Sequence, residues 1–193
     1  VGDMIARIPD GTLRSEDVAY ADLAPDGTVP PLTPEDPRVI RMRTFSKGYG
    51  MAGARVGYAI GHPDLILAFD KVRNHFGLSR VSQAGALAAL GDQAYLADVK
   101  AEVATARDSI AAIARTHDLT PIPSATNFVT IDCRRDGAFA TRVLTELGHR
   151  GVFIRKPGAA PLDRCIRVTC GPPGALAAFA AALPDALAAA SEG

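Results

Sequence analysis

Residues 44–58 read TFSKGYGMAGARVGY, and this stretch contains two overlapping patterns with different chemistry. Gly48, Gly50 and Gly53 spell G-x-G-x-x-G, the fingerprint of a dinucleotide-binding loop. Such a loop needs a strand before the glycines and a helix after them, whose N-terminus receives the pyrophosphate. RVIRM at 38–42 is typical of that strand, but ARVGYAI at 54–60 favours a second strand instead of the helix. An NAD-binding oxidoreductase is therefore only an alternative.

The second pattern places a lysine among hydroxyl groups and an arginine. A lysine held between a strand end and a glycine-rich turn is partly shielded from water, which frees the amine of Lys47 to form a Schiff base with an aldehyde. Arg55 carries a planar fork suited to a phosphate, and Thr44 and Ser46 add hydroxyl donors. The glycines allow the backbone to approach a bulky ligand closely. An aldehyde joined to a phosphate within reach of one lysine describes pyridoxal phosphate.

The stretch closely resembles the lysine motif of the class I/II aminotransferases, which have fold type I, and especially that of the histidinol-phosphate aminotransferase branch. The motif reads S-K-x-x-G-x-x-G-x-R-x-G-Y, and every fixed position is matched: Ser46, Lys47, Gly50, Gly53, Arg55, Gly57 and Tyr58. The resemblance implies an α/β fold, with part of the large-domain sheet followed by a small C-terminal α/β domain. It also implies that Lys47 is the catalytic lysine and that Thr44, Ser46 and Arg55 help to bind pyridoxal 5'-phosphate.

A further resemblance lies upstream, in EDVAYADLAP at 16–25. The family carries D-E-A-Y some thirty residues before its lysine, and Asp17 and Tyr20 match its first and last positions. The resemblance implies that Asp17 pairs with the pyridine nitrogen and that Tyr20 hydrogen-bonds the ring's phenolic oxygen. Two departures accompany the match: Val18 replaces the glutamate, and residues 14–16 are polar where the family has a buried apolar strand.

The C-terminal part resembles the family's closing motif, R-[IV]-[ST]-x-G, in CIRVTCG at 165–171. The resemblance implies that Arg167 grips an anionic group of the substrate and that Arg155 is a second anion-binding arginine. Asn127, at the start of NFVTID, would lie near the substrate. The alternatives are solvated strand arginines and a plain turn residue.

The pattern of apolar and turn residues predicts alternating strands and helices, and hence an α/β architecture. We expect three parts: residues 1–75 of a large domain, connecting helices over 76–115, and a small domain over 116–193. Gly91-Asp92 should divide residues 79–115 into two helices, and further helices are expected at 65–73, 137–150 and 174–190. In the small domain, strands are expected at LTPIP, 127–132, 151–154 and 165–170.

Composition excludes several classes of protein. Lys+Arg and Asp+Glu are both 21, so no global field attracts nucleic acid or a membrane surface. No uninterrupted apolar run reaches the roughly 18 residues of a membrane helix. The three cysteines form no zinc-binding pattern and, being odd in number, argue for a reducing compartment. Because VGDMIARIPDG does not resemble a signal peptide, we expect a cytoplasmic protein.

By resemblance, the activity is a ping-pong transfer of an amino group between an amino acid or amino alcohol phosphate, such as histidinol phosphate, and a 2-oxo acid in a homodimer. The runner-up is a pyridoxal-phosphate-dependent decarboxylase of a phosphorylated amino acid. Since the resemblance covers only the C-terminal part of the family, we expect a fragment of a longer polypeptide. A non-catalytic fragment is therefore a further alternative for the 193 residues themselves.

Overall fold

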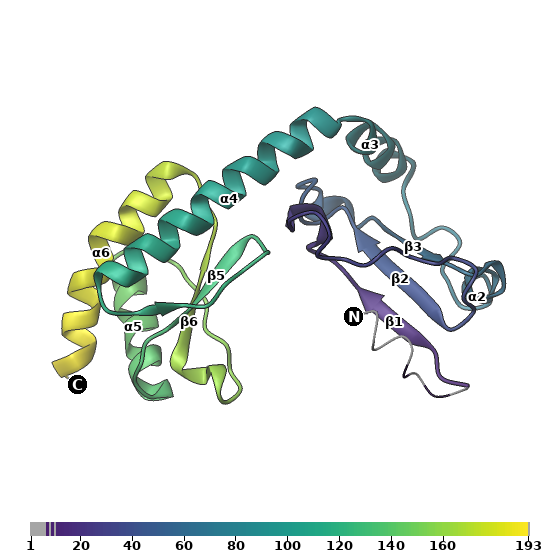
Figure 1. Cartoon of the computed structure of the whole chain (residues 1–193). Helices are drawn as coiled ribbons and strands as arrows, with labels where there is room; N and C mark the ends of the chain where they lie inside the picture. Colours follow the sequence, from purple (N-terminus) through teal and green to yellow (C-terminus); the bar gives the residue numbers. More distant parts are fainter. Residues whose placement is uncertain (1–6, 8, 10, 193) are drawn as a thin grey trace. The chain divides into compact units, whose positions relative to one another are not determined.

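The computed structural model describes residues 7, 9 and 11–192. The chain divides into two compact units, Val1–Lys100 and Ala101–Gly193. The division falls inside a long helix, α4 (Gln93–Thr116), and each unit contains its own three-stranded sheet (Figure 1).

The first unit is built on a mixed sheet with the order β1-β2-β3. The central strand β2 (Val39–Thr44) runs parallel to β1 (Arg14–Asp17) and antiparallel to β3 (Gly57–Gly61). The remaining elements are short 3-10 turns and helices: η1 (Ala21–Leu23), η2 (Ala52–Ala54), α2 (Pro63–Phe69) and α3 (Arg80–Gly91). α3 begins at the Ser79 cap, whose hydroxyl accepts from Ser82 N–H, and it ends at Gly91 as predicted.

The first strand is polar in sequence, as noted for residues 14–16, yet it is partly buried. Glu16 of β1 is opposite Arg41 of β2 in the parallel register, and both residues are 6% exposed. Arg41 pairs with Glu16, and Arg14 adds a second ion pair to the same carboxylate at 3.0 Å. Ion pairing therefore replaces apolar burial in this strand.

The directions of the strands place the predicted cofactor residues at one end of the first sheet, where the carboxyl ends of β1 and β2 lie. Because β1 and β2 are parallel, their carboxyl ends lie together: Asp17 is paired with Met42, two residues before β2 ends at Thr44. The antiparallel β3 begins at this same edge, where Gly57 is paired with Thr44. Carboxyl ends of strands are the usual ligand-binding edge of α/β sheets.

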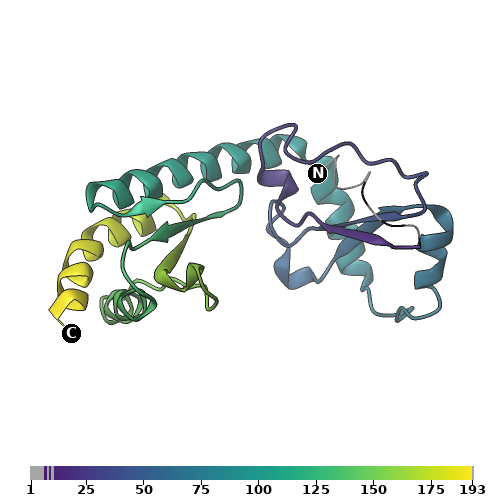
Figure 2. The same cartoon turned by 60° about the horizontal axis from the view of Figure 1, so that its bottom comes forward.

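The second unit packs helices against an antiparallel sheet of order β4-β5-β6. The strands are β4 (Thr120–Pro121), β5 (Phe128–Asp132) and β6 (Cys165–Thr169), and the helices after α4 are α5 (Gly137–His149), the 3-10 turn η3 (Leu162–Arg164) and α6 (Pro173–Glu192). α5 and α6 lie side by side (Figure 1, Figure 2). Val129 and Ile131 of β5 and Ile166 of β6 are buried in the core shared with these helices.

Residues 151–154 form no strand, so the strand predicted there is wrong. Gly151 turns the chain after α5 with a φ of +76°, and Phe153 is 89% exposed. The next residue, Arg155, forms an isolated antiparallel bridge with Arg167 of β6. A short apolar run flanked by glycine predicted a strand, but these side chains have no partner strand to pack against.

By length and composition, α6 is apolar enough to cross a membrane, with a mean hydropathy of 1.4 over an 18-residue window. The count of uninterrupted apolar residues did not indicate this, because Pro184 and Asp185 interrupt the run. The core helix of a soluble protein passes the same test, and Phe179 and Leu183 of α6 are buried in the core of the second unit. With 22% of the window buried, α6 packs one face against the core of the second unit.

Candidate functional site

The turn that carries Lys47 is fixed by its own backbone and by a small apolar cluster. Gly50 N–H donates to the Lys47 carbonyl at 3.0 Å, and Met51 N–H donates to the Phe45 carbonyl at 2.9 Å. Gly50 has a φ of +67°, a conformation that glycine adopts without steric cost. Phe45 is 4% exposed and packs with Val56. The Lys47 backbone therefore starts from a rigid base.

The Lys47 side chain reaches Tyr20, the last residue of the upstream motif. Lys47 Nζ lies over the Tyr20 ring, 5.2 Å from its centroid, within the range of a cation–π contact. Lys47 is half-buried, and no carboxylate among the described residues forms an ion pair with it. The structure thus brings together the two residues that the sequence places 27 positions apart.

Thr44 and Ser46 present their hydroxyl groups beside this lysine. Thr44 Oγ1 donates to Ser46 Oγ at 2.9 Å and accepts the Ser46 backbone N–H at 3.0 Å. Because Ser46 Oγ accepts this bond, its own hydrogen is left for an acceptor that is not among the described residues. Such a hydroxyl suits an anionic ligand.

Arg55 has a left-handed backbone, with φ 52° and ψ 45°. This conformation is uncommon outside glycine and costs roughly 1–2 kcal/mol. Arg55 Nη1 donates to the Ala52 carbonyl at 2.8 Å, the side chain is exposed, and no described carboxylate pairs with the guanidinium. Strain at an unpaired arginine beside a candidate site points to a binding role.

Asp17 is the remaining predicted site residue of the first unit. It is the last residue of β1, it is exposed, and it forms no ion pair with any described residue. Thus the same end of the sheet carries a carboxylate, an amine and a guanidinium that form no ion pairs among the described residues. Charges of both signs left without protein partners can bind a ligand that has both cationic and anionic groups.

In the second unit, Arg155 and Arg167 stand directly opposite each other. Arg155 N–H donates to the Arg167 carbonyl at 3.0 Å, and Arg167 N–H donates to the Arg155 carbonyl at 2.7 Å. Directly opposed residues share one face of a sheet, so the two cations are neighbours. No described carboxylate pairs with either of them, which makes this pair a candidate anion site.

Arg167 is held in place by an aromatic ring. Its guanidinium lies 4.6 Å from the centroid of Phe128, and its Nε is buried without a hydrogen-bond partner among the described residues. A buried donor of this kind costs free energy unless a ligand accepts from it. Asn127, next to Phe128, is half-buried; its backbone carbonyl accepts from Cys170 N–H at 2.8 Å. The Asn127 amide itself forms no side-chain hydrogen bond within the described part of the chain.

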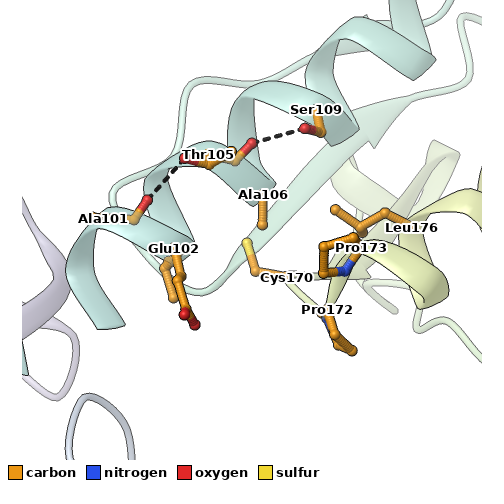
Figure 3. A pocket seen from close by; sticks show the side chains of 11 residues that line it. Ala101, Glu102, Thr105, Ala106, Ser109, Cys170, Pro172, Pro173 and Leu176 are labelled. Atoms are coloured by element: carbon orange, nitrogen blue, oxygen red, sulfur yellow. Dashed lines mark hydrogen bonds between the residues drawn. The ribbon is translucent and has the colours of Figure 1, made fainter. Parts of the chain in front are cut away.

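The second unit also contains a cavity of about 770 Å³ that the sequence did not indicate. Its walls are formed by residues 101–109 of α4 and by the turn between β6 and α6. Cys170 lies on the wall (Figure 3). The hydroxyls of Thr105 and Ser109 donate to carbonyls of their own helix, so the lining is mostly apolar (Figure 3). None of the predicted site residues lines it.

Sequence reasoning also missed the ion pair between Asp22 of η1 and Arg43 of β2. Asp22 lies two residues after Tyr20, and Arg43 lies one residue before Thr44, so each is a close neighbour of a predicted site residue. No sequence pattern connects two charges that are 21 residues apart.

Comparison with known proteins agrees with this geometry. A family model described as "Aminotransferase class I and II" matches residues 12–183. A histidinol-phosphate aminotransferase of Bacillus licheniformis is 35% identical over 170 residues, which cover 86% of this chain and 46% of the relative. Histidinol-phosphate aminotransferase 1 of Mesorhizobium japonicum is 36% identical over 186 residues, covering 93% of this chain and 50% of the relative.

A solved structure shows the same fold. The histidinol-phosphate aminotransferase of Sinorhizobium meliloti in complex with pyridoxal-5'-phosphate matches with a TM-score of 0.93 and 46% identity, over 96% of this chain and 52% of that chain. This likeness confirms the predicted α/β fold of fold-type I transferases. The chain spans about half the length of the curated relatives it matches.

Proposed function

The chain belongs to the class I and II aminotransferase family, and from this membership we propose that the protein containing it is a pyridoxal-phosphate-dependent aminotransferase with Lys47 as its cofactor lysine. The observation that carries the proposal is the place of Lys47 Nζ, 5.2 Å from the Tyr20 ring centroid at the carboxyl edge of the sheet. Because the chain spans about half of its relatives, the activity is proposed for the whole protein.

The described residues of the first unit fit this cofactor. Lys47 supplies an amine that pairs with no described carboxylate for its aldehyde. The Ser46 hydroxyl and the N–H groups of Arg55 that are not bonded to the Ala52 carbonyl supply donors for its phosphate. Thr44 orients Ser46. Asp17 supplies an unpaired carboxylate for the ring nitrogen, and Tyr20 supplies a hydroxyl for the ring oxygen.

When bound, pyridoxal phosphate withdraws electrons from the substrate's Cα and so weakens the bonds to that atom. Lys47 is the residue that would hold the cofactor through its aldehyde, and the substrate's amine would displace it. Once free, Lys47 Nζ would accept the proton from the substrate's Cα and so carry protons in the reaction. The backbone hydrogen bonds of the Phe45–Met51 turn fix the point on the chain from which the Lys47 side chain extends.

The substrate class follows from the second unit. Arg155 and Arg167 place two neighbouring cations on one sheet face, and Arg167 Nε lacks an acceptor among the described residues. A phosphate or carboxylate satisfies both. We propose histidinol phosphate, or a similar amino alcohol phosphate or amino acid, as donor and a 2-oxo acid as acceptor, with Asn127 near the substrate. The names of the matching relatives support this choice.

The dinucleotide alternative does not fit the structure. Gly53 lies in the short turn η2, and the chain continues into the antiparallel strand β3 instead of a helix. The pyrophosphate would therefore meet no helix N-terminus. The decarboxylase alternative shares the lysine and the arginines, so only the products of the reaction separate it from the aminotransferase.

We also propose a cytoplasmic homodimer. Several large apolar side chains of the first unit are exposed, as at an interface: Leu67, Val72, Phe76, Val81, Leu87 and Tyr95. The three cysteines are free, which suits a reducing compartment. Light scattering after size-exclusion chromatography tests the dimer, and a monomer across micromolar concentrations would refute it.

A product assay tests the reaction. The protein containing this chain is incubated with histidinol phosphate and 2-oxoglutarate, and both glutamate and carbon dioxide are measured. The proposal predicts glutamate without carbon dioxide, and it predicts that Lys47→Arg abolishes the reaction. Lys71→Arg is the matched control, because Lys71 is exposed and lies outside the site. Carbon dioxide release would support the decarboxylase, and full activity of Lys47→Arg would end the proposal.

A further inference from the structure

The ion pair of Asp22 and Arg43 joins the two segments that meet at Lys47. Asp22 lies in η1, two residues after Tyr20, and Arg43 lies on β2, four residues before Lys47. Arg43 Nη2 contacts Asp22 Oδ1, and the side chains are 21% and 7% exposed, respectively. The pair is therefore largely shielded from solvent and closes a link between η1 and β2.

Asp22 also supports the backbone beside Lys47. A Cβ placed on Gly48 would lie 3.0 Å from Asp22 Cβ and 3.2 Å from Leu96 Cδ1. A Cβ there would require Asp22 or Leu96 to shift, so Gly48 lies close against Asp22. The short turn η1 thus has two contacts with the lysine turn: Asp22 against Gly48, and Tyr20 under Lys47 Nζ.

We propose that the Asp22–Arg43 pair is a positioning device that sets where Lys47 Nζ lies. Arg43 holds η1 to the strand that leads into the lysine turn, and η1 in turn holds Tyr20 beneath the amine. Removal of either charge frees η1 to move away from β2, and Lys47 then loses its position over Tyr20. Neither Asp22 nor Arg43 contacts the reacting atoms in this account.

The unsatisfied atoms of the pair indicate that it positions η1 more than it stabilises the fold. Asp22 Oδ2 and Arg43 Nε are buried without a hydrogen-bond partner among the described residues. A buried ion pair with unsatisfied atoms contributes little net stability, and apolar residues of similar volume would serve as well. An apolar pair could not supply the directional hydrogen bond that Arg43 donates to Asp22.

The inference deepens the proposed function and rests on it for its catalytic meaning, since Lys47 is the lysine proposed to hold the cofactor. The position of the amine, however, can be measured without cofactor. A methylated amine held over an aromatic ring gives NMR signals displaced upfield by the ring current. The chain contains only four lysines, Lys47, Lys71, Lys100 and Lys156, so the spectrum is simple.

In the experiment, the 193-residue chain is reductively methylated with carbon-13 formaldehyde, and Lys47→Arg identifies the Lys47 signal. We expect the Lys47 signal upfield of that of exposed Lys71. Asp22→Asn should move it to the Lys71 position, and Arg43→Gln, which leaves Asp22 in place, should do the same. Asp22→Glu, which keeps the charge, should retain the upfield position.

Glu16→Gln is the matched control, because Glu16 and Arg41 form a buried ion pair in the same sheet away from Lys47. It should lower the melting temperature and leave the Lys47 signal in place. Circular dichroism establishes that each spectrum is recorded on folded protein. The inference is overturned if wild-type Lys47 resonates with Lys71, if both Asp22→Asn and Arg43→Gln keep the upfield signal, or if Glu16→Gln removes it equally.

Addition of pyridoxal phosphate and borohydride to unmethylated samples of the same variants separates this inference from the proposed function. An upfield Lys47 signal that depends on Asp22, in a protein that forms no adduct at Lys47, would support the positioning and refute the cofactor role. An adduct at Lys47 with equal half-saturation in wild type and Asp22→Asn would support the cofactor role and refute the positioning.

Discussion

Glu16 and Arg41 form a buried ion pair between two parallel strands, with Arg41 Nε and Nη2 each 2.8 Å from Glu16 Oε2. Arg41 also donates to the Pro30 carbonyl at 2.9 Å, and Arg14 contacts the other carboxylate oxygen. This arrangement satisfies a charge that an apolar strand would never carry. The stability of the pairing between β1 and β2 depends on it.

Replacing Glu16 with Gln should therefore destabilise the first unit strongly. The substitution leaves Arg41 buried without a counter-charge, and breaking a buried pair from one side costs about 3 kcal/mol or more. Urea unfolding measures the loss. Arg38→Gln serves as comparison, because Arg38 pairs with Asp36 at a more exposed site and should change stability far less. Equal effects of the two substitutions would contradict the account.

Arg55→Gly should stabilise the chain while weakening its affinity for the cofactor. Glycine relieves the left-handed strain at φ 52°, a gain of up to about 1 kcal/mol after the greater entropy of the unfolded chain is counted. The guanidinium proposed for the phosphate is lost. Unfolding curves and the concentration of pyridoxal phosphate that half-saturates the adduct measure the two effects. Arg55→Lys should keep the strain and weaken affinity too; unchanged affinity in both variants would rule out the phosphate role.

Arg155→Gln should remove the response of the second unit to phosphate. In wild type, phosphate should raise the melting temperature because it binds the Arg155–Arg167 pair only in the folded state. Without phosphate, the variant should be more stable by about 0.2–1 kcal/mol, since two like charges no longer face each other. Arg150→Gln is the control, because Arg150 pairs with Glu146 and should leave the response intact. Identical responses in both variants would exclude this anion site.

The Cys133 thiol should make the stability of the chain fall in alkaline solution. Burial raises the pKa of Cys133 to about 11 from its usual 9.0, and nearby Cys165 adds to the effect. The folded chain therefore binds a proton that the unfolded chain has lost. The stabilising contribution is complete below pH 9 and is lost as pH rises through about 11.

Unfolding free energies of wild type and Cys133→Ala at pH 8 and pH 11 measure this contribution. The difference between the two proteins should change by an amount on the order of 2 kcal/mol over that interval. A parallel pH dependence in wild type and variant would show that another group is responsible.

Local sequence signals predicted much of the fold. Gly91 and Asp92 marked the break between α3 and α4, because glycine and a capping residue end one helix and start another. The strand β1 could not be predicted, because its polar residues are buried only through partners such as Arg41, which lies 25 positions away. The prediction of a strand at 151–154 was wrong for the opposite reason. The local pattern favoured a strand, but these residues form no ladder with another strand of the described chain.

Part of the candidate site could likewise be predicted from the sequence, and part could not. The motif around Lys47 and the pair Asp17 and Tyr20 were visible as fixed spacings, and the structure places Lys47 over Tyr20. The left-handed backbone of Arg55 was not visible, because the glycines of the stretch were the natural candidates for positive φ. The Asp22–Arg43 link was hidden as well, since an ion pair across the fold leaves no periodic signal.

The central claim, that Lys47 is the cofactor lysine, is tested most directly by locating a reduced adduct. The chain is mixed with pyridoxal phosphate, reduced with borohydride and digested, and the modified peptide is identified by mass spectrometry. The account predicts a pyridoxyl group on Lys47, with little on Lys71, Lys100 or Lys156, and no preferred site in Lys47→Arg. Modification spread over the other three lysines, with Lys47 unmodified, would contradict it.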